Sequence, residues 1–193
     1  MDLGLRNKRA LVTGSSRGLG YAAASLLAKE GCKVAINGRD EEKIKATAEK
    51  LAQETGTQVI GLAGDVSDAS VPEKLVQQTV ESLGGLDILI TNASGPVPGS
   101  IDSLDEAAWQ KGIDLSLMAH VRLIKAALPH LRRSDSASVL TITSYSVKQP
   151  IPNLLISNSV RAATAGLTKT LALELGNENI LLNSMLPGWT AIE

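Results

Sequence analysis

Several residue types are scarce in this chain, and each scarcity narrows the kind of protein it can be. A single cysteine, Cys32, excludes an internal disulfide. Phenylalanine is absent and the aromatic residues are two Trp and two Tyr, so Leu, Ile, Val and Ala must build the core. This composition suits a buried parallel sheet packed by Ala-rich helices.

Neither sign of charge dominates, and long apolar runs are missing. With 19 basic and 20 acidic side chains the formal net charge is -1, so we expect no nucleic acid and no membrane surface as partner. No uncharged apolar run reaches the roughly 18 residues of a spanning helix. Residues 1–9 are too polar for a signal peptide. We therefore expect a cytoplasmic protein whose partners are small molecules and copies of itself.

Short apolar runs alternate with segments of helical period along the whole chain. At 193 residues the chain suits one domain, and we interpret 1–193 as a single unit. Strands separated by helices imply right-handed crossovers and a parallel sheet covered on both faces. The sequence thus predicts an α/β fold, a Rossmann-type doubly wound sheet in three layers. Its strands are expected at 8–13, 32–37, 58–62, 86–91, 138–143 and 180–185.

The helices are predicted from apolar stripes and from signals at their ends. Two capping boxes, Ser70-Val71-Pro72-Glu73 and Ser103-Leu104-Asp105-Glu106, indicate helices over 70–83 and over 103–132. Apolar residues at helical spacing predict the other helices at 19–31, 44–52 and 154–175.

A glycine-rich turn follows the first predicted strand. The segment Thr13-Gly14-Ser15-Ser16-Arg17-Gly18-Leu19-Gly20 stands between a strand and a helix, which is the context that a dinucleotide site requires. Its glycines allow a sharp turn and a close approach to a pyrophosphate, while the helix N-terminus offers free N–H groups. The alternative is a tight turn without a ligand.

The end of the second strand indicates which dinucleotide is bound. Asn37-Gly38-Arg39 lacks the acidic residue that accepts hydrogen bonds from the ribose 2′-hydroxyl in NAD-selective sites. Arg39 and Arg17 suit a 2′-phosphate dianion instead, so we expect NADP(H) to be preferred over NAD(H). The alternative is that both are solvated surface arginines. Asp40 is expected to cap the next helix rather than to bind ribose.

In their order, these motifs resemble the short-chain dehydrogenase/reductase superfamily, particularly its branch similar to 3-oxoacyl-acyl-carrier-protein reductase, over essentially the whole chain. Further motifs stand after the third, fourth and sixth strands: Asp65-Val66, Thr91-Asn92-Ala93-Ser94-Gly95 and Pro187-Gly188-Trp189-Thr190. The resemblance implies that Asp65 and Val66 meet the adenine. It also implies that the segment with Pro187, Gly188 and Thr190 lies beside the nicotinamide, and that Asn92, Ala93 and Ser94 line the cofactor site.

The family uses a Ser that polarises the substrate carbonyl, a Tyr that transfers the proton, a Lys and a helix Asn. By motif the Ser is Ser144, whereas Ser157 and Arg161 stand at the Tyr and Lys positions and Asp114 at the Asn position. An aliphatic hydroxyl is a much weaker acid than a phenol, so Ser157 is a poor proton donor. Arg161 stays charged and could hold the ribose hydroxyls, but it cannot shuttle a proton.

Other residues near these motifs have two open interpretations each. Tyr145 adjoins Ser144 and is either an alternative proton donor or a packing or substrate-contacting residue. Trp189 either walls the site or packs. His120 and His130 are expected to be exposed or at an interface. No metal site is expected.

The sequence therefore predicts an NADP(H)-dependent oxidoreductase, of the carbonyl reductase or alcohol dehydrogenase type, with atypical catalytic residues. Its expected substrate is a small-molecule carbonyl or alcohol. One alternative is an NADP(H)-binding protein with little or no redox activity, and another is an enzyme of non-redox chemistry. The resemblance also implies a homo-oligomer, a dimer or tetramer, formed through the two long helices. Because Glu193 comes soon after the sixth strand, it further implies that the substrate-loop region and a last strand are absent from this sequence.

Overall fold

The computed structural model describes residues 2–190 and contains one six-stranded sheet. All neighbouring strands pair in parallel, in the order β3-β2-β1-β4-β5-β6. The order reverses between β1 and β4, as in doubly wound sheets, so the predicted Rossmann-type fold is confirmed. The strands are β1 (Arg9–Val12), β2 (Lys33–Gly38), β3 (Val59–Ala63), β4 (Ile88–Thr91), β5 (Ser138–Ile142) and β6 (Leu181–Met185).

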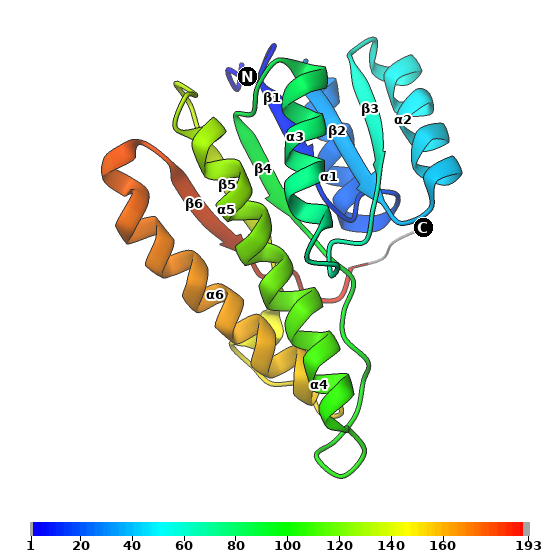
Figure 1. Cartoon of the computed structure of the whole chain (residues 1–193), viewed down its shortest axis with the longest axis vertical. Helices are drawn as coiled ribbons and strands as arrows, with labels where there is room; N and C mark the ends of the chain where they lie inside the picture. The colour runs from blue at the N-terminus through cyan, green and yellow to red at the C-terminus, as the bar shows by residue number, and fades with distance from the viewer. Residues whose placement is uncertain (1, 191–193) are drawn as a thin grey trace.

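Helices cover both faces of the sheet. Figure 1 shows α3, α5 and α6 in front of the sheet and α1 behind it. Alternate residues of β1 enter separate cores: Leu11 packs with the α3 and α5 side, while Ala10 and Val12 pack with the α1 and α2 side. No helix in residues 2–190 has the length and apolar character needed to cross a membrane. The helices are α1 (Gly18–Lys29), α2 (Glu41–Thr55), α3 (Val71–Leu83), α4 (Glu106–Ile113), α5 (Ala119–Leu131) and α6 (Leu155–Leu175).

Two helix starts differ from the predicted capping boxes. Asp105 caps α4 by accepting a hydrogen bond from the Ala108 N–H at 2.8 Å, whereas Ser103 accepts one from the Ser100 N–H in the preceding turn. Ser70 precedes α3 without making a side-chain cap. A carboxylate is a stronger acceptor than a hydroxyl beside the positive end of a helix, which explains why Asp105 replaces Ser103. Asp40 caps α2 as predicted, accepting from the Lys43 N–H at 2.9 Å.

The long helix predicted over 103–132 is divided by a π-helical segment, η1 (Asp114–Met118), between α4 and α5. Such wide turns are rare and occur frequently at functional sites. The hydroxyl of Thr164 in α6 donates a hydrogen bond to the Ser116 carbonyl at the middle of this segment. The π segment thus fixes α6 against the start of α5.

An ion pair joins β1 to β4 at the amino ends of the strands. Arg9 Nε and Nη2 donate to the two carboxylate oxygens of Asp87, each at 2.7 Å, and Ser134 Oγ donates at 2.6 Å. Burial opposes the ionisation of Asp87, but the hydrogen bonds from Arg9 and Ser134 outweigh it and lower its pKa to about 2. This charged pair lies at the opposite end of the strands from the cavity described next, and we assign it to stability.

Candidate functional site

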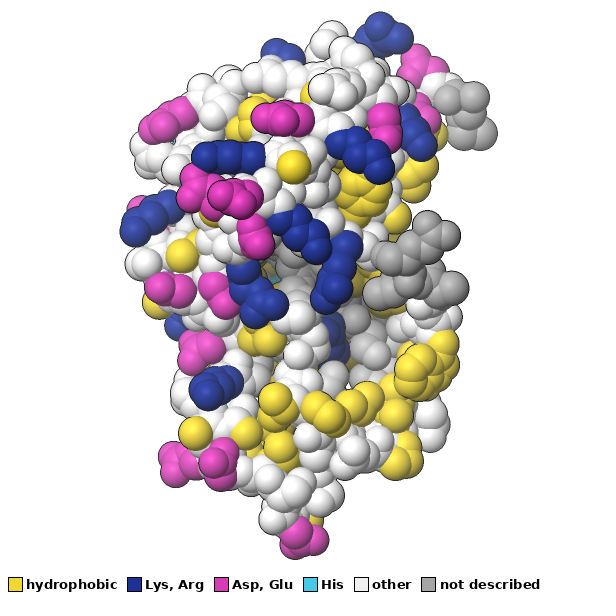
Figure 2. All heavy atoms as spheres, turned by 90° about the vertical axis from the view of Figure 1, so that its right-hand side faces the viewer, with side chains coloured by type: hydrophobic (Ala, Val, Ile, Leu, Met, Phe, Trp, Pro, Cys, Tyr) yellow, Lys and Arg dark blue, Asp and Glu magenta, His cyan; other side chains and the backbone are white. Residues whose placement is uncertain are grey.

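A cavity of about 480 Å³ lies at the carboxyl ends of the strands, where the strand order reverses. Figure 2, which shows the side of the molecule where α2 lies, has a hollow bordered by Lys and Arg side chains. Among residues 2–190, no three His, Cys, Asp or Glu side chains are grouped to hold a metal ion. The lining includes all predicted cofactor residues except Ser15, Gly20, Arg161 and Pro187, and adds Gly64 and Trp189.

The glycine turn adopts a backbone that other residues resist. Gly14 has φ +56° and Gly18 has φ +60°, the left-handed region that favours glycine. A Cβ on Gly14 would lie 2.7 Å from the carbonyl oxygen of Asn92, and one on Gly20 would collide with the Gly14 carbonyl. Asn92 Nδ2 donates to that same Gly14 carbonyl at 2.9 Å. The turn therefore packs directly on the loop after β4, and its glycines are required sterically.

Ser15 and Asn37 hold the turn in place through the backbone. Ser15 is buried; its Oγ donates to the Val12 carbonyl at 2.6 Å and accepts from the Asn37 N–H at 2.9 Å. The amide of Asn37 donates to the carbonyls of Leu62 and Gly64, both at 3.1 Å. Asn37 thus lines the cavity while its side chain ties β2 to β3. The sequence does not reveal these roles of Ser15 and Asn37, because both side chains form their hydrogen bonds with backbone atoms.

Two cations stand at the mouth of the cavity without counter-charges. Arg17 and Arg39 line it, both are exposed, and neither makes an ion pair within residues 2–190. The adjacent Asp40 is engaged as the cap of α2. Asp65 also lines the cavity, and its Oδ1 accepts hydrogen bonds from the Ser67 N–H at 3.0 Å and from the Ser67 hydroxyl at 2.7 Å. The mouth of the cavity therefore offers two guanidinium groups that make no ion pair within residues 2–190, while the carboxylates of Asp40 and Asp65 accept hydrogen bonds from Lys43 and Ser67.

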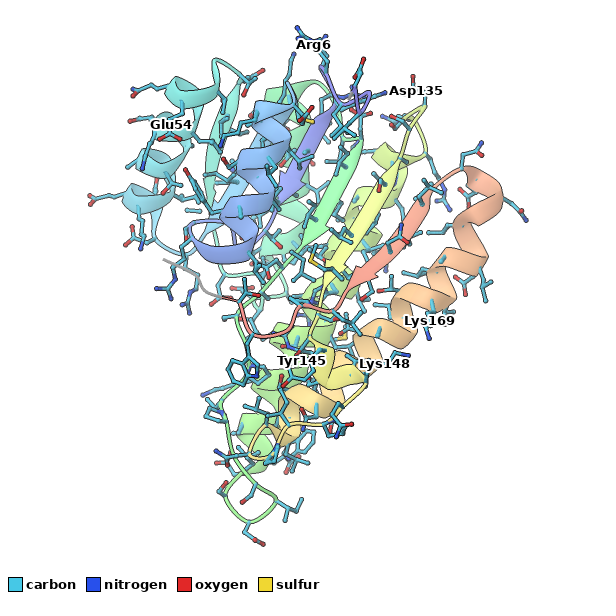
Figure 3. All side chains as sticks on the ribbon, turned by 180° about the vertical axis from the view of Figure 1, so that it is seen from behind. Arg6, Glu54, Asp135, Tyr145, Lys148 and Lys169 are labelled. Carbon is cyan, nitrogen blue, oxygen red and sulfur yellow. The ribbon has the colours of Figure 1, made fainter. Side chains whose placement is uncertain are left out.

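The loop after β5 places Ser144 and Tyr145 beside the loop after β6. Ser144 Oγ accepts from the Ser146 N–H at 3.1 Å and begins a short 3-10 turn, η2 (Tyr145–Val147). The Tyr145 N–H donates to the Pro187 carbonyl at 3.0 Å, and the Tyr145 ring comes within 3.9 Å of where a Cβ on Gly188 would stand. Figure 3 shows Tyr145 beneath the carboxyl ends of β5 and β6, close to the first turns of α6. Pro187 thus holds Tyr145 through its backbone carbonyl, and it is not among the residues that line the cavity.

Ser157 and Arg161 lie one helical turn apart near the start of α6. Ser157 is buried, with 8% of its surface exposed. Arg161 Nη1 donates to the Thr143 carbonyl at 2.9 Å and to the Ile142 carbonyl at 3.5 Å. Arg161 therefore reaches from α6 to the residue before Ser144, and Ser157 lies one helical turn before Arg161 on α6.

Asp114 makes its hydrogen bonds with other residues. Its carboxylate accepts from Gln110 Nε2 at 2.9 Å and from Arg122 Nη2 at 3.0 Å, and these contacts, the Gln110 hydrogen bond first, lower its pKa. From α6, the Thr164 hydroxyl donates to the backbone carbonyl of Ser116 in η1; Ser116 is buried, and its Oγ has no hydrogen-bond partner within residues 2–190.

His120 is buried, with 2% exposed, so the expectation that it is exposed or at an interface is wrong. Its Nδ1 lies 2.6 Å from the Thr91 hydroxyl at the end of β4. Burial, followed by the positive charge of Arg161, lowers its pKa to about 4. The signal was available in the sequence, since Leu123, Ile124 and Ala127 follow at helical spacing and share its buried face.

The depressed pKa of His120 predicts that the fold weakens in mild acid. Between its folded pKa of about 4 and the unfolded value near 6.5 the unfolded chain binds more protons, so stability falls as the pH drops below 6.5. We expect the free energy of unfolding to fall by about 2 kcal/mol more between pH 7 and pH 5 in the natural protein than in His120→Asn. Urea unfolding at both pH values measures this difference; equal pH dependence in the two proteins would contradict the assignment.

Comparison with known proteins identifies relatives over most of the chain. The family model described as short chain dehydrogenase matches residues 8–193. The human protein named dehydrogenase/reductase SDR family member 4 is 37% identical over 185 residues, which cover 95% of this chain and 66% of that protein. The chain thus spans about two thirds of the length of this relative.

Solved structures share the fold closely. The L-sorbose reductase of Gluconobacter frateurii, complexed with NADPH and L-sorbose, superposes with a TM-score of 0.96 at 32% identity and covers 100% of this chain and 73% of its own. A short chain dehydrogenase of Burkholderia cenocepacia in complex with NADP superposes with a TM-score of 0.91 at 31% identity. The match covers 98% of this chain and 77% of the Burkholderia chain.

Proposed function

This chain belongs to the short-chain dehydrogenase family, and on that premise we propose that it is an NADP(H)-dependent oxidoreductase acting on a carbonyl or alcohol by hydride transfer. The observation that carries the proposal is the cavity behind the glycine turn, lined by Arg17 in that turn and by Arg39 just after β2, neither of which makes an ion pair within residues 2–190. The carboxylate of Asp40, next to Arg39, is engaged as the cap of α2. The structures that bind NADPH and NADP support it.

The lining of the cavity offers groups suited to each part of a dinucleotide. The N-terminus of α1 has no side-chain cap at Arg17, so its N–H groups can hold a pyrophosphate. Arg17 and Arg39 would hold the 2′-phosphate, with Asp65 and Val66 beside the adenine. Gly188 and the residues around it would lie beside the nicotinamide, and when bound, NADPH supplies the hydride.

The residues around Ser144 define an altered reaction centre. We assign Ser144 to polarising the substrate carbonyl, because within residues 2–190 its hydroxyl donates no hydrogen bond while its oxygen accepts from the Ser146 N–H. Arg161 supplies a fixed positive charge and N–H donors for the ribose hydroxyls. Ser157 is too weak an acid to protonate the product. The proton would come from water, from Tyr145 or from the substrate, so rates on ordinary ketones should be low.

The proposal is tested by following NADPH oxidation with simple β-ketoesters. We expect saturable oxidation at rates well below about 10 per second, a typical enzyme turnover. Oxidation at 10 per second or above would show that the altered residues do not limit the reaction. NADPH binding without oxidation across a broad panel of carbonyls would identify a dinucleotide-binding protein instead, and failure to bind NADPH would reject the proposal.

A further inference from the structure

A second cavity, of about 390 Å³, adjoins the cofactor cavity. It lies between the loop after β4 and helix α4, and its lining shares Arg39 and Ser94 with the lining of the cofactor cavity. Arg39 therefore stands at the boundary between the two cavities. Figure 2 shows that Lys and Arg side chains border the hollow on this side of the molecule.

Lys111 on α4 is a second cation in the lining of this cavity. Lys111 and Arg39 are both exposed, and neither makes an ion pair within residues 2–190. The lining also contains the carboxylate of Asp105, whose Oδ1 accepts a hydrogen bond from the Ala108 N–H as the cap of α4. Two cations thus face one cavity, and the carboxylate beside them is engaged with the helix backbone.

The packing of α4 on the loop after β4 fixes the place of Lys111. The next residue, Gly112, is buried; a Cβ there would collide with Ile156 of α6 and would lie 3.5 Å from the Cβ of Pro96. Glycine therefore lets the backbone of α4 approach the loop closely, which puts the base of the Lys111 side chain at the rim of the cavity. Because lysine carries its charge on a flexible four-carbon stem, the ammonium can move toward an anion bound inside.

The charges of the lining favour an anion in this place. Two like charges that face one cavity repel each other, and an anion between them is attracted by both. A cavity of about 390 Å³ is comparable in width to the Debye length of ~8 Å at physiological ionic strength, so salt does not fully screen Lys111 from an anion held at Arg39. In the proposed function, the anion held at Arg39 is the 2′-phosphate of NADP(H).

We propose that Lys111 is a third cation for the 2′-phosphate of NADP(H) and thus a further determinant of cofactor choice. Arg39 offers a planar fork of N–H groups to the phosphate, whereas Lys111 supplies a mobile point charge from the side of α4. Cofactor choice then depends on α4 as well as on the glycine turn and the end of β2. The inference rests on the proposed function, because it takes the 2′-phosphate to be bound at Arg39.

The test is the dissociation constant of NADPH and of NADH for the natural protein and for Lys111→Gln. We expect Lys111→Gln to bind NADPH about fivefold more weakly, because one exposed charge pair contributes modestly, and to bind NADH equally well, because NADH lacks the phosphate. Lys125→Gln is the matched control: Lys125 is exposed, makes no ion pair within the described residues, and lines a different cavity, between α3 and α5. Both affinities should be unchanged in that control.

Salt separates a charge effect from a packing effect. We expect the loss in Lys111→Gln to shrink as ionic strength rises, since salt screens an exposed ammonium. Unchanged NADPH affinity in Lys111→Gln, an equal loss of NADH affinity, or a loss that salt does not reduce would overturn the inference and leave the proposed function standing. A natural protein that fails to bind NADPH would reject both. Circular dichroism checks that each variant is folded.

Discussion

Replacing Ser157 by Tyr and Arg161 by Lys together is expected to raise the rate of NADPH-dependent ketone reduction by about 100-fold or more, because positioned acid catalysis contributes roughly 10²–10⁴-fold. The two residues stand one turn apart near the start of α6, and Arg161 already reaches the end of β5 beside Ser144. Ser157→Tyr would supply a phenol, and the cation of Arg161→Lys one turn away would lower the pKa of that phenol. Steady-state kinetics with a β-ketoester measures the gain.

The matched control moves the phenol to the outside of the same helix. Ser159 is exposed on α6, so Ser159→Tyr with Arg161→Lys adds the same groups without placing the ring at the reaction centre. We expect no gain from this control or from Arg161→Lys alone. If the folded Ser157→Tyr, Arg161→Lys protein is no faster than the natural one, the site differs from the family at more than these positions, and Ser116 in η1 is the next residue to examine.

Gly14→Ala is expected to weaken NADPH binding by at least about tenfold and to lower the free energy of unfolding by about 3 kcal/mol, from backbone strain and overpacking together. The left-handed backbone at Gly14, with φ +56°, disfavours any side chain. The added Cβ would also lie 2.7 Å from the Asn92 carbonyl oxygen. Because the glycine turn contacts the backbone of Asn92, the added Cβ would displace both the glycine turn and the loop after β4, which line the cavity.

Gly56→Ala separates the effect of backbone strain from the effect of the collision between the added Cβ and Asn92. Gly56 ends α2 with φ +67° and has nothing within 4 Å of a built Cβ, so alanine there meets the backbone strain without the collision. We expect a loss of about 1 kcal/mol in stability and unchanged NADPH affinity. Thermal unfolding and cofactor titration of both variants give the comparison. Equal losses of affinity would show that the close packing of Gly14 on Asn92 does not shape the site.

The fold and the cavity were predictable because their signals are local. The strands are short apolar runs, and the glycine turn, Asp65-Val66 and the segment from Pro187 each follow a strand, so the parallel arrangement alone brings them to one edge of the sheet. Arg39 could likewise be placed from the position of Asn37 and Gly38 at the end of β2.

The features that sequence reasoning missed depend on contacts between distant elements. The π segment packs on α6, since Thr164 bonds to the Ser116 carbonyl, and Asp114 within it bonds to Gln110 and Arg122 rather than to the residues around Ser144. The scaffold roles of Asn37 and Ser15 are hydrogen bonds to backbone atoms, which no side-chain pattern reveals. His120 was misplaced although its apolar neighbours share its face, because a histidine was assumed to be solvated.

The central claim is that Arg17 and Arg39 select NADP(H). The most direct measurement is the dissociation constant of NADPH and of NADH for the natural protein and for Arg39→Ala, with Arg133→Ala as control. We expect NADPH to bind at least about tenfold more tightly than NADH, because a charge-assisted hydrogen bond contributes roughly 1.5–3 kcal/mol. Arg39→Ala should remove most of that preference, and the control should keep it. Equal affinity of the natural protein for NADH and NADPH would contradict the account.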